Sequence, residues 1–387
     1  MTVEYNKGNI AEAILASAVG ARFKKRFKSS DFNGKSDESV KIGNLPLVGI
    51  QDIREVLGQV VKGPASFTVK DFDRKTKKEV DITDNISVSV SIPQKDLLFL
   101  QTSSNWNKIN SIFNAAISKV NSDSKLRGQA YGLSVNKRYD TINVSAQGTL
   151  DQKGTKVDIS VSVSSVSPKT GKSAPAPRGS KISLKYDAPQ FAQAVGLEFE
   201  NFGKIFDELE LNNYNLFSSM FESEVKLVYP DILGKRFDDR DAIKNSNEVK
   251  ALKKVAKKVF ESVSSQLNEK LQIKTFKEKL ARYCISKATS NESGVELVKF
   301  TSSGTSKTQS FGPKFIEGVS NSELEATFSG SGSDPKIIVH LKGKGPSKSY
   351  TLIQFRYRTD AGAKDKNNKQ KILMRSYVES GDLLYKL

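Results

Sequence analysis

The sequence predicts an α+β fold: a central mixed sheet flanked by helices, with a basic helical segment and a β-rich C-terminal region. Two observations predict it. Stretches with helical spacing and stretches with strand alternation follow one another over the first two hundred residues. After them, one long helical stretch covers 246–288, and alternation dominates from residue 294 onward. We therefore expect a first domain at 1–230, with strands and a helix inserted at 66–120, and a second at 231–387.

Apolar residues recur at helical spacing in five stretches. The first is 9–23, where Ile10, Ile14 and Phe23 share one face. The longest is 246–288, whose apolar stripe includes Val255 and Val259, while its lysines point away from that stripe. The pattern predicts helices over 9–23, 47–62, 104–120, 190–211 and 246–288.

Strand alternation appears in short runs separated by polar turns. In the first half these runs are rich in Ser, Thr and Val, as in NISVSVSI and TKVDISVSV. In the last hundred residues they carry more large apolar side chains, as in KIIVHLK and YTLIQFRYR. The pattern predicts strands over 66–72, 85–92, 141–148, 155–163, 181–186, 294–301, 322–329, 336–342, 350–358 and 371–378.

The scarce residues exclude several kinds of chemistry. Cys284 is the single cysteine, so the chain forms no internal disulfide and no cysteine-rich zinc site. His340 is the single histidine, which excludes paired-histidine zinc sites. His340 could still belong to a Ser-His-Asp triad, but no G-x-S-x-G motif accompanies it. An enzyme built on this sequence would rely on carboxylates and lysines.

The charge predicts a polyanionic partner. The sequence has 61 Lys and Arg against 43 Asp and Glu, a net charge of +18. Residues 250–287 hold 11 basic against 3 acidic side chains, and 336–387 hold 12 against 4. Such blocks are expected where a protein contacts phosphates, here those of double-stranded DNA. The alternative is a lysine-rich face that only solvates the protein. The candidate DNA contacts are Lys253, Lys254, Lys257, Lys258, Arg356, Arg358 and Arg375.

The sequence predicts no membrane segment. The first ten residues contain an acid and no apolar run, so we expect no signal peptide. No stretch of about 18 apolar residues occurs, so we expect no membrane-spanning helix. The expected location is the cytoplasm, which would be that of the host cell for a phage-encoded protein, with the virion as an alternative.

Four side chains follow an order that resembles a known family. Glu12 lies in the first predicted helix, Asp158 in a small-residue strand, Lys185 near the end of the next strand, and Gln193 just beyond it. This order resembles the PD-(D/E)xK nuclease superfamily. The usual acid two residues before the lysine is Ser183 here, an S-x-K variant. The stretches DTINVSAQGTLDQKGTKVDISV and SLKYDAPQFAQAVG also look similar to large uncharacterised bacteriophage proteins, and the resemblance covers about residues 1–200.

The resemblance implies a metal-dependent DNA endonuclease that hydrolyses phosphodiester bonds. Mg²⁺, or Mn²⁺ in its place, would be bound by Glu12, Asp158 and Glu198, with either Glu198 or Glu200 replacing the missing acid. Lys185 would orient the attacking water, and Ser183 and Gln193 would complete the catalytic set.

Two other functions remain open. One is a non-catalytic DNA-binding or virion-associated protein on a degenerate nuclease fold; the other is a basic structural protein without a nucleic-acid role. A homodimer is also left open. For the nuclease we expect Asp158 and Lys185 on neighbouring strands, with Glu12 and either Glu198 or Glu200 reaching the same pocket from their helices.

Overall fold

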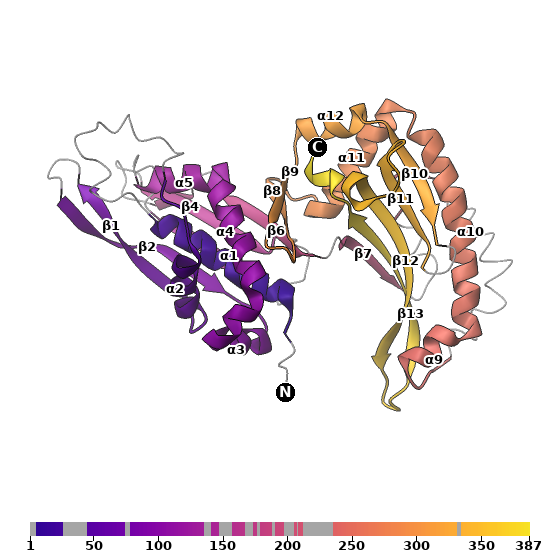
Figure 1. Ribbon diagram of the computed structural model, residues 1–387, viewed down its shortest axis with the longest axis horizontal. Helices are drawn as coiled ribbons and strands as arrows, with labels where there is room; N and C mark the ends of the chain where they lie inside the picture. The colour runs from indigo at the N-terminus through magenta and orange to yellow at the C-terminus, as the bar shows by residue number, and fades with distance from the viewer. Residues whose placement is uncertain are drawn as a thin grey trace. The chain divides into compact units, whose positions relative to one another are not determined.

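The structure of the protein is a computed structural model that divides into two compact units. Unit 1 comprises Met1–Ala188 and Glu292–Ser310, and unit 2 comprises Pro189–Asn291 and Phe311–Leu387. Figure 1 labels the elements of both. The structure describes residues 5–25, 45–73, 78–134, 141–146, 157–166, 173–175, 179–187, 190–196, 205–206, 208–211, 235–330 and 334–387.

The division differs from the predicted boundary at residue 230. Unit 2 already begins at Pro189, and residues 292–310 return to unit 1. The return is made by β8 (Val295–Phe300), which pairs in parallel with β6 (Ser180–Tyr186). Strands so far apart in sequence pair through tertiary contacts that no local pattern reports.

Among the described residues of unit 1, the α-helices are α1 to α5, and these precede residue 135. The long helix α1 comes first, and its start is held by Asp96, whose carboxylate accepts hydrogen bonds from the Asn6 backbone N–H and from Asn9 Nδ2. The bounds of the helices in unit 1 are α1 (Lys7–Lys24), α2 (Ile50–Val60), α3 (Gln94–Gln101), the 3-10 helix η4 (Ser103–Ile109), α4 (Asn110–Ser122) and α5 (Ser124–Ser134).

The strands of unit 1 form the predicted central mixed sheet. In the part that the structure describes, its order is β1-β2-β3-β4-β6-β8-β9, with β5 paired to β4. The pairs β2–β3 and β6–β8 are parallel, and the others are antiparallel. The remaining bounds are β1 (Ala65–Asp73), β2 (Lys78–Val90), β3 (Thr141–Ala146), β4 (Ile159–Val166), β5 (Ser173–Pro175) and β9 (Ser306–Ser310). The strands β1 and β2, which lie in the segment predicted as inserted, belong to this sheet.

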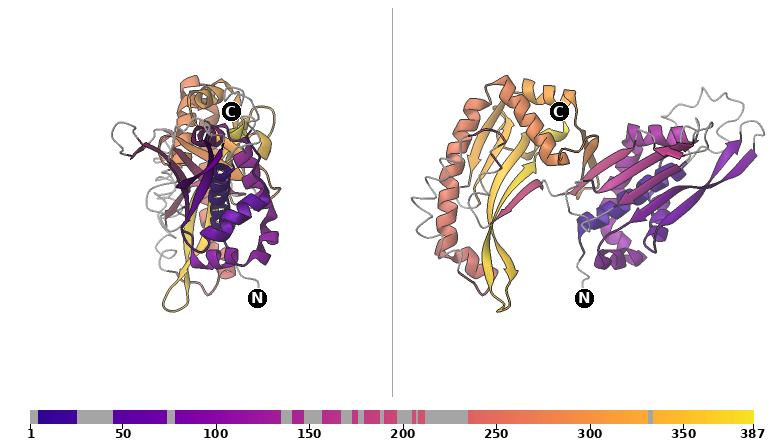
Figure 2. Two further views of the ribbon diagram at one scale, coloured as in Figure 1. Left: turned by 90° about the vertical axis from the view of Figure 1, so that its left-hand side faces the viewer. Right: turned by 180° about the vertical axis from the view of Figure 1, so that it is seen from behind.

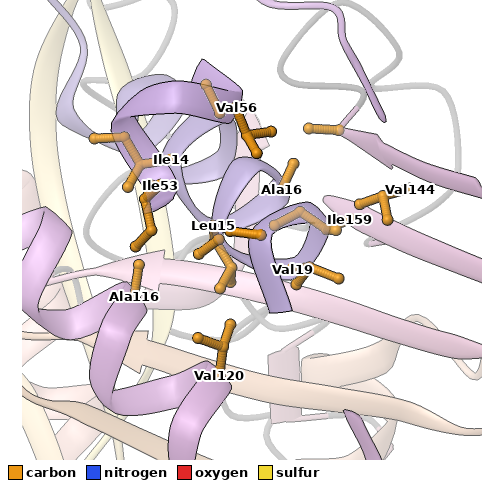
Figure 3. Close-up of a cluster of buried hydrophobic side chains, with 14 of the residues drawn as sticks. Ile14, Leu15, Ala16, Val19, Ile53, Val56, Ala116, Val120, Val144 and Ile159 are labelled. Carbon is orange, nitrogen blue, oxygen red and sulfur yellow. The ribbon is translucent and has the colours of Figure 1, made fainter. Parts of the chain in front are cut away.

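The core of unit 1 surrounds α1. Every residue of α1 from Asn9 to Phe23 is buried, because the helix lies against the sheet on one side and against α2 and α4 on the other. Figure 3 shows Leu15 and Val19 of α1 close to Val120 of α4. At Gly20 a Cβ atom would lie 2.6 Å from Cγ2 of Val88, so glycine allows α1 to approach β2 closely.

On the other face of this sheet, the strands β2, β3 and β4 carry polar side chains. Serine, threonine and asparagine side chains bond across the strands there, as Ser145 and Ser160 do at 2.7 Å and Ser87 and Asn143 at 2.5 Å. These residues alternate along the strands with apolar ones such as Val144 that face α1. The small-residue strands seen in the sequence therefore bury one face and expose hydroxyl groups on the other.

Unit 2 places helices over one face of an antiparallel sheet of order β10-β11-β12-β13-β7. Figure 2 shows this sheet and the long helix α10 from two further directions. The core between them includes Phe355, whose ring centroid lies 5.0 Å from that of Phe206 and 6.0 Å from that of Tyr283. The bounds are β7 (Gln190–Gly196), α9 (Arg240–Asn245), α10 (Asn247–Lys270), α11 (Lys274–Thr289), α12 (Pro313–Asn321), β10 (Leu324–Ser329), β11 (Lys336–Leu341), β12 (Thr351–Lys364), β13 (Gln370–Ser380) and the 3-10 helices η7 (Lys348–Tyr350) and η8 (Leu383–Tyr385).

Most predicted elements are confirmed, with two corrections. The helix predicted from Gln190 is wrong at its start, because 190–196 forms β7 and pairs with β13. The stretch FAQAV fits either period, and pairing with β13 decides it. The helix predicted over 246–288 is two helices, α10 and α11, separated at Leu271–Ile273. Within the described residues, no helix is both long enough and apolar enough to cross a membrane.

Candidate functional site

Asp158 and Lys185 meet on neighbouring strands, as expected. Asp158 stands directly before β4, and Lys185 lies near the end of β6, which pairs with β4. Asp158 Oδ2 lies 3.4 Å from Lys185 Nζ and accepts the backbone N–H of Leu184 at 2.5 Å. Both side chains are about one-fifth exposed, so solvent reaches the pair. The pair joins a carboxylate and an ammonium group at one sheet position.

Glu12 does not share this position. Leu184 belongs to the apolar core that surrounds α1, so Leu184 points toward that helix. Successive side chains of a strand point to opposite faces, which places Lys185 on the face away from α1. Glu12 is buried on α1 and therefore lies on the other side of the sheet from the Asp158–Lys185 pair. The expectation that Glu12 enters the same pocket is wrong, because α1 covers the opposite face.

Ser183 lies in the middle of the β6 segment, and its side chain is fully buried. It shares a face with Lys185, because the two residues are two positions apart. Ser183 Oγ has no hydrogen-bond partner among the described residues. A buried hydroxyl group without a partner is costly, which makes this oxygen a candidate contact for a ligand.

Two further predicted residues have other positions. Gln193 lies on β7 in unit 2, where it is the register partner of Tyr377 of β13, and not on a helix. Gln193 therefore belongs to the sheet of unit 2, whereas Asp158 and Lys185 belong to the sheet of unit 1. Its assignment to the catalytic set is not supported. Glu198 and Glu200, the alternative predicted replacement ligands, lie outside the described residues.

The described donors do not make a magnesium site. Asp158 supplies one carboxylate, and its Oδ2 atom already accepts from Leu184 and contacts Lys185. Mg²⁺ is usually bound by one or two carboxylates together with waters and substrate phosphates. Within the described part of the chain, no group of three His, Cys, Asp or Glu side chains is placed to bind a metal ion. The residues described at this position therefore do not fit a metal centre.

Lys299 is a neighbour of the pair that the sequence analysis did not select. It lies on β8 as the register partner of Lys185, and only 1% of its surface is exposed. The sequence signal for Lys299 was its position within the apolar run VELVKF. A lysine in such a buried strand is unusual, because lysine is rarely buried. The pairing with Lys185 could not be read from the sequence, since β6 and β8 are more than a hundred residues apart.

A second candidate surface is the arginine face of unit 2, which we define as the side of the sheet that carries Arg356, Arg358 and Arg375. Arg358 and Arg375 are register partners on β12 and β13. All three lie on the side opposite α10 and α11, because the intervening Phe355 and Tyr357 are buried in the helix-facing core. Arg356 is paired with Asp334 at 3.4 Å.

The predicted lysines of α10 lie on the other side of unit 2. Lys254 and Lys257 are exposed, and Lys253 and Lys258 are partly exposed, whereas Val255 and Val259 are buried. The helix lysines therefore face away from the core, as expected. α10 covers the sheet face opposite the arginines, but Lys253 of α10 and Arg356 both contact Asp334, at 3.3 and 3.4 Å, so the two basic groups approach each other at this carboxylate.

The positive charge is shared between the units. Unit 1 has 31 Lys and Arg against 20 Asp and Glu, a net charge of +11, and unit 2 has 30 against 23, a net charge of +7. Acids elsewhere in unit 2 offset its two basic blocks. Glu208 and Glu210, for example, form ion pairs with Lys287 and Lys279 of α11.

Comparison of the chain with protein-family models, curated proteins and solved structures finds no match.

Proposed function

We propose that the protein binds double-stranded DNA through phosphate contacts made by the arginine face of unit 2. The observation that carries the proposal is the register pairing of Arg358 with Arg375, with Arg356 two residues away on the same face. Three arginines on one sheet face give a phosphate backbone several guanidinium groups to contact.

The chemistry of these side chains supports a phosphate partner. A guanidinium group presents donors in a planar fork that matches two phosphate oxygens. Arg375 is partly exposed, and its Nε atom has no hydrogen-bond partner among the described residues. The net charge of +18 adds long-range attraction to a polyanion. Phosphate contacts position a protein on DNA without reading its sequence, so we expect binding with little sequence preference.

The double variant Arg358→Gln/Arg375→Gln tests this proposal. We expect the logarithm of the association constant for a labelled duplex to fall linearly with the logarithm of salt concentration between about 50 and 200 mM. Loss of two phosphate contacts should make that slope shallower by about 1.8 and weaken binding alike for all duplex sequences. Fluorescence anisotropy of several duplexes measures both quantities.

The matched control is Lys254→Gln/Lys257→Gln, which removes the same charge from the exposed side of α10. We expect this variant to keep the slope of the unmodified protein. If the salt dependence of binding becomes shallower in the helix variant and stays unchanged in the arginine variant, DNA binds to α10 and the proposal is wrong.

A second candidate function is Mg²⁺-dependent DNA cleavage, and one observation favours it: the approach of Asp158 to Lys185 at 3.4 Å in a partly exposed position. A metal centre there would need carboxylates beyond those described, such as Glu198. In this candidate Lys185 would orient the water that attacks the phosphodiester.

Cleavage is tested by nicking of supercoiled DNA with and without Mg²⁺. If the second candidate holds, Asp158→Asn and Lys185→Gln should each lower the nicking rate at least a hundredfold, roughly the size of one general acid–base contribution. DNA affinity should stay unchanged. Lys181→Gln, an exposed position on the same strand, is the control. Nicking that persists in Asp158→Asn would rule out this site.

A further inference from the structure

The hairpin formed by β12 and β13 extends beyond the rest of the sheet of unit 2. β11 pairs with β12 only as far as Arg356, and β7 pairs with β13 only from Met374 onward. Among the described strands, the remaining parts of β12 and β13 therefore pair only with each other. Figures 1 and 2 show their paired ends extending past β10 and β11. We call residues 358–373, a two-stranded extension of the sheet, the ribbon.

Contacts from the segment before α10 hold the ribbon in place. An isolated two-stranded hairpin is only marginally stable in water. Here Phe237 and Gln370 exchange two backbone hydrogen bonds of 2.8 Å, and Lys369 forms an ion pair with Asp238. The short helix α9 contacts both β12 and β13. The ribbon is therefore fixed to unit 2 before any partner binds.

The turn at the end of the ribbon is ordered by one carboxylate. Asp365 Oδ1 accepts hydrogen bonds from the backbone N–H groups of Asn367 at 2.9 Å and Lys369 at 3.0 Å. Asn368 has a φ of 60°, a conformation that asparagine tolerates in turns. This turn leaves the side chain of Lys366 exposed at the end of the ribbon.

The ribbon continues the positive charge of the arginine face. Residues 358–375 hold six Lys and Arg against two Asp. Lys371 lies on the same face as Arg375, because the two are four positions apart on β13. A Cβ atom at Gly362 would lie 3.0 Å from Cγ of Lys371, so the glycine leaves room for the lysine stem. Within the described part of the chain, neither Lys366 nor Lys371 forms an ion pair, so both ammonium groups are available to an anion.

The dimensions of B-form DNA select the groove that such a ribbon can enter. The major groove is about 12 Å wide and admits a two-stranded ribbon, whereas the minor groove is about 6 Å wide. Neighbouring strands are already about 5 Å apart, so a ribbon with its side chains is too wide for an undistorted minor groove.

We propose that the ribbon enters the major groove of a bound duplex, where Lys366 and Lys371 contact the phosphates along its edges. This inference rests on the proposed function, because the arginine face supplies the neighbouring phosphate contacts. It adds the element that enters the DNA and the groove that this element occupies.

The double variant Lys366→Gln/Lys371→Gln tests the contact. We expect the salt dependence of duplex binding to become shallower by about 1.8 through loss of two phosphate contacts. The matched control is Lys342→Gln/Lys344→Gln. These two lysines are exposed in the connection between β11 and β12, at the other end of β12 from the ribbon, so the control should keep the slope of the unmodified protein.

The slopes separate this inference from the proposed function. If the ribbon variant keeps the slope and Arg358→Gln/Arg375→Gln makes it shallower, the arginine face binds DNA without the ribbon and the inference is wrong. If the ribbon variant becomes shallower and the arginine variant does not, the proposed function is wrong and the ribbon contact stands. Absence of duplex binding by the unmodified protein overturns both.

Cross-linking from the turn identifies the groove. Asn367→Cys provides an exposed thiol, while the natural Cys284 is fully buried. Duplexes would carry an activated disulfide tether either on C5 of thymine, in the major groove, or on N2 of guanine, in the minor groove. We expect the major-groove tether to react at least about tenfold faster, because the bound ribbon raises the local concentration of the thiol.

The control for cross-linking is Ser265→Cys, which places a thiol at an exposed position of α10. We expect this variant to react slowly with both tethers. Faster reaction of Asn367→Cys with the minor-groove tether would contradict entry into the major groove. Equal reaction of Ser265→Cys and Asn367→Cys with the major-groove tether would show that the ribbon has no special place on the duplex, and would overturn the inference.

Discussion

Lys119→Met is expected to lower the free energy of unfolding of unit 1 by about 3 to 5 kcal/mol, the cost of removing one partner from a buried ion pair. Lys119 is 2% exposed, and its Nζ atom lies 2.6 Å from Asp123 Oδ2 and 3.1 Å from Glu296 Oε2. It also donates to Thr308 Oγ1 at 3.2 Å. Methionine keeps the apolar stem, so the loss comes from two carboxylates left without their cation.

Trp106, the single tryptophan, reports on this change because it lies in unit 1 and donates its Nε1 hydrogen to the Leu100 carbonyl oxygen at 2.7 Å. Urea unfolding followed by its fluorescence measures the free energy. Lys24→Met is the control, since Lys24 forms a more exposed pair with Glu55 at 2.8 Å and should cost at most about 1 kcal/mol. Equal midpoints for both variants would mean that the Lys119 network adds nothing to stability.

Gly381→Ala is expected to destabilise unit 2 by about 3 kcal/mol, at the upper end of the cost of overpacking. Gly381 follows β13 and donates its N–H to the Leu352 carbonyl oxygen at 2.9 Å. A Cβ atom at this position would lie 1.9 Å from the Thr351 carbonyl oxygen and 2.4 Å from its carbonyl carbon. Both are backbone atoms, so β12 and β13 would have to separate.

Cys284, the single cysteine, reports on unit 2. It is fully buried in α11, and burial raises the pKa of its thiol, so labelling requires opening of the structure. We expect Gly381→Ala to speed thiol labelling at least a hundredfold, the equilibrium factor for about 3 kcal/mol when opening is fast. Gly312→Ala is the control because a Cβ atom there meets nothing within 4 Å. Equal labelling rates for the two variants would contradict the steric argument.

The Asp158–Lys185 pair was predicted from the sequence because both residues lie at recognisable points of short strands. The order of these residues along the chain motivated the prediction, and the structure confirms that the two side chains lie within 3.4 Å of each other. Lys299 was missed as a neighbour of Lys185, because the β6–β8 pairing joins segments separated by the whole of residues 187–294. A lysine inside an apolar strand predicts that its side chain is buried, but it does not predict which residues lie beside it.

Glu12 shows the limit of motif order as evidence. Its position in the first helix matched the expected order, but a helix that packs on a sheet covers one face only. The choice of face follows from apolar residues such as Ile182 and Leu184. That choice places Asp158 and Lys185 on the side away from Glu12.

By itself the sequence determined the local elements, the net charge and the scarcity of cysteine and histidine. Periodicity in stretches such as 9–23 reports which side chains can be buried together, and that information is local. The tertiary structure alone decided that 190–196 is a strand, that 292–310 returns to unit 1, and that the arginines lie on the sheet face opposite the helices. The physical reason is that strand pairing and the choice of a sheet face depend on partners distant in sequence, whose contacts outweigh weak local preferences.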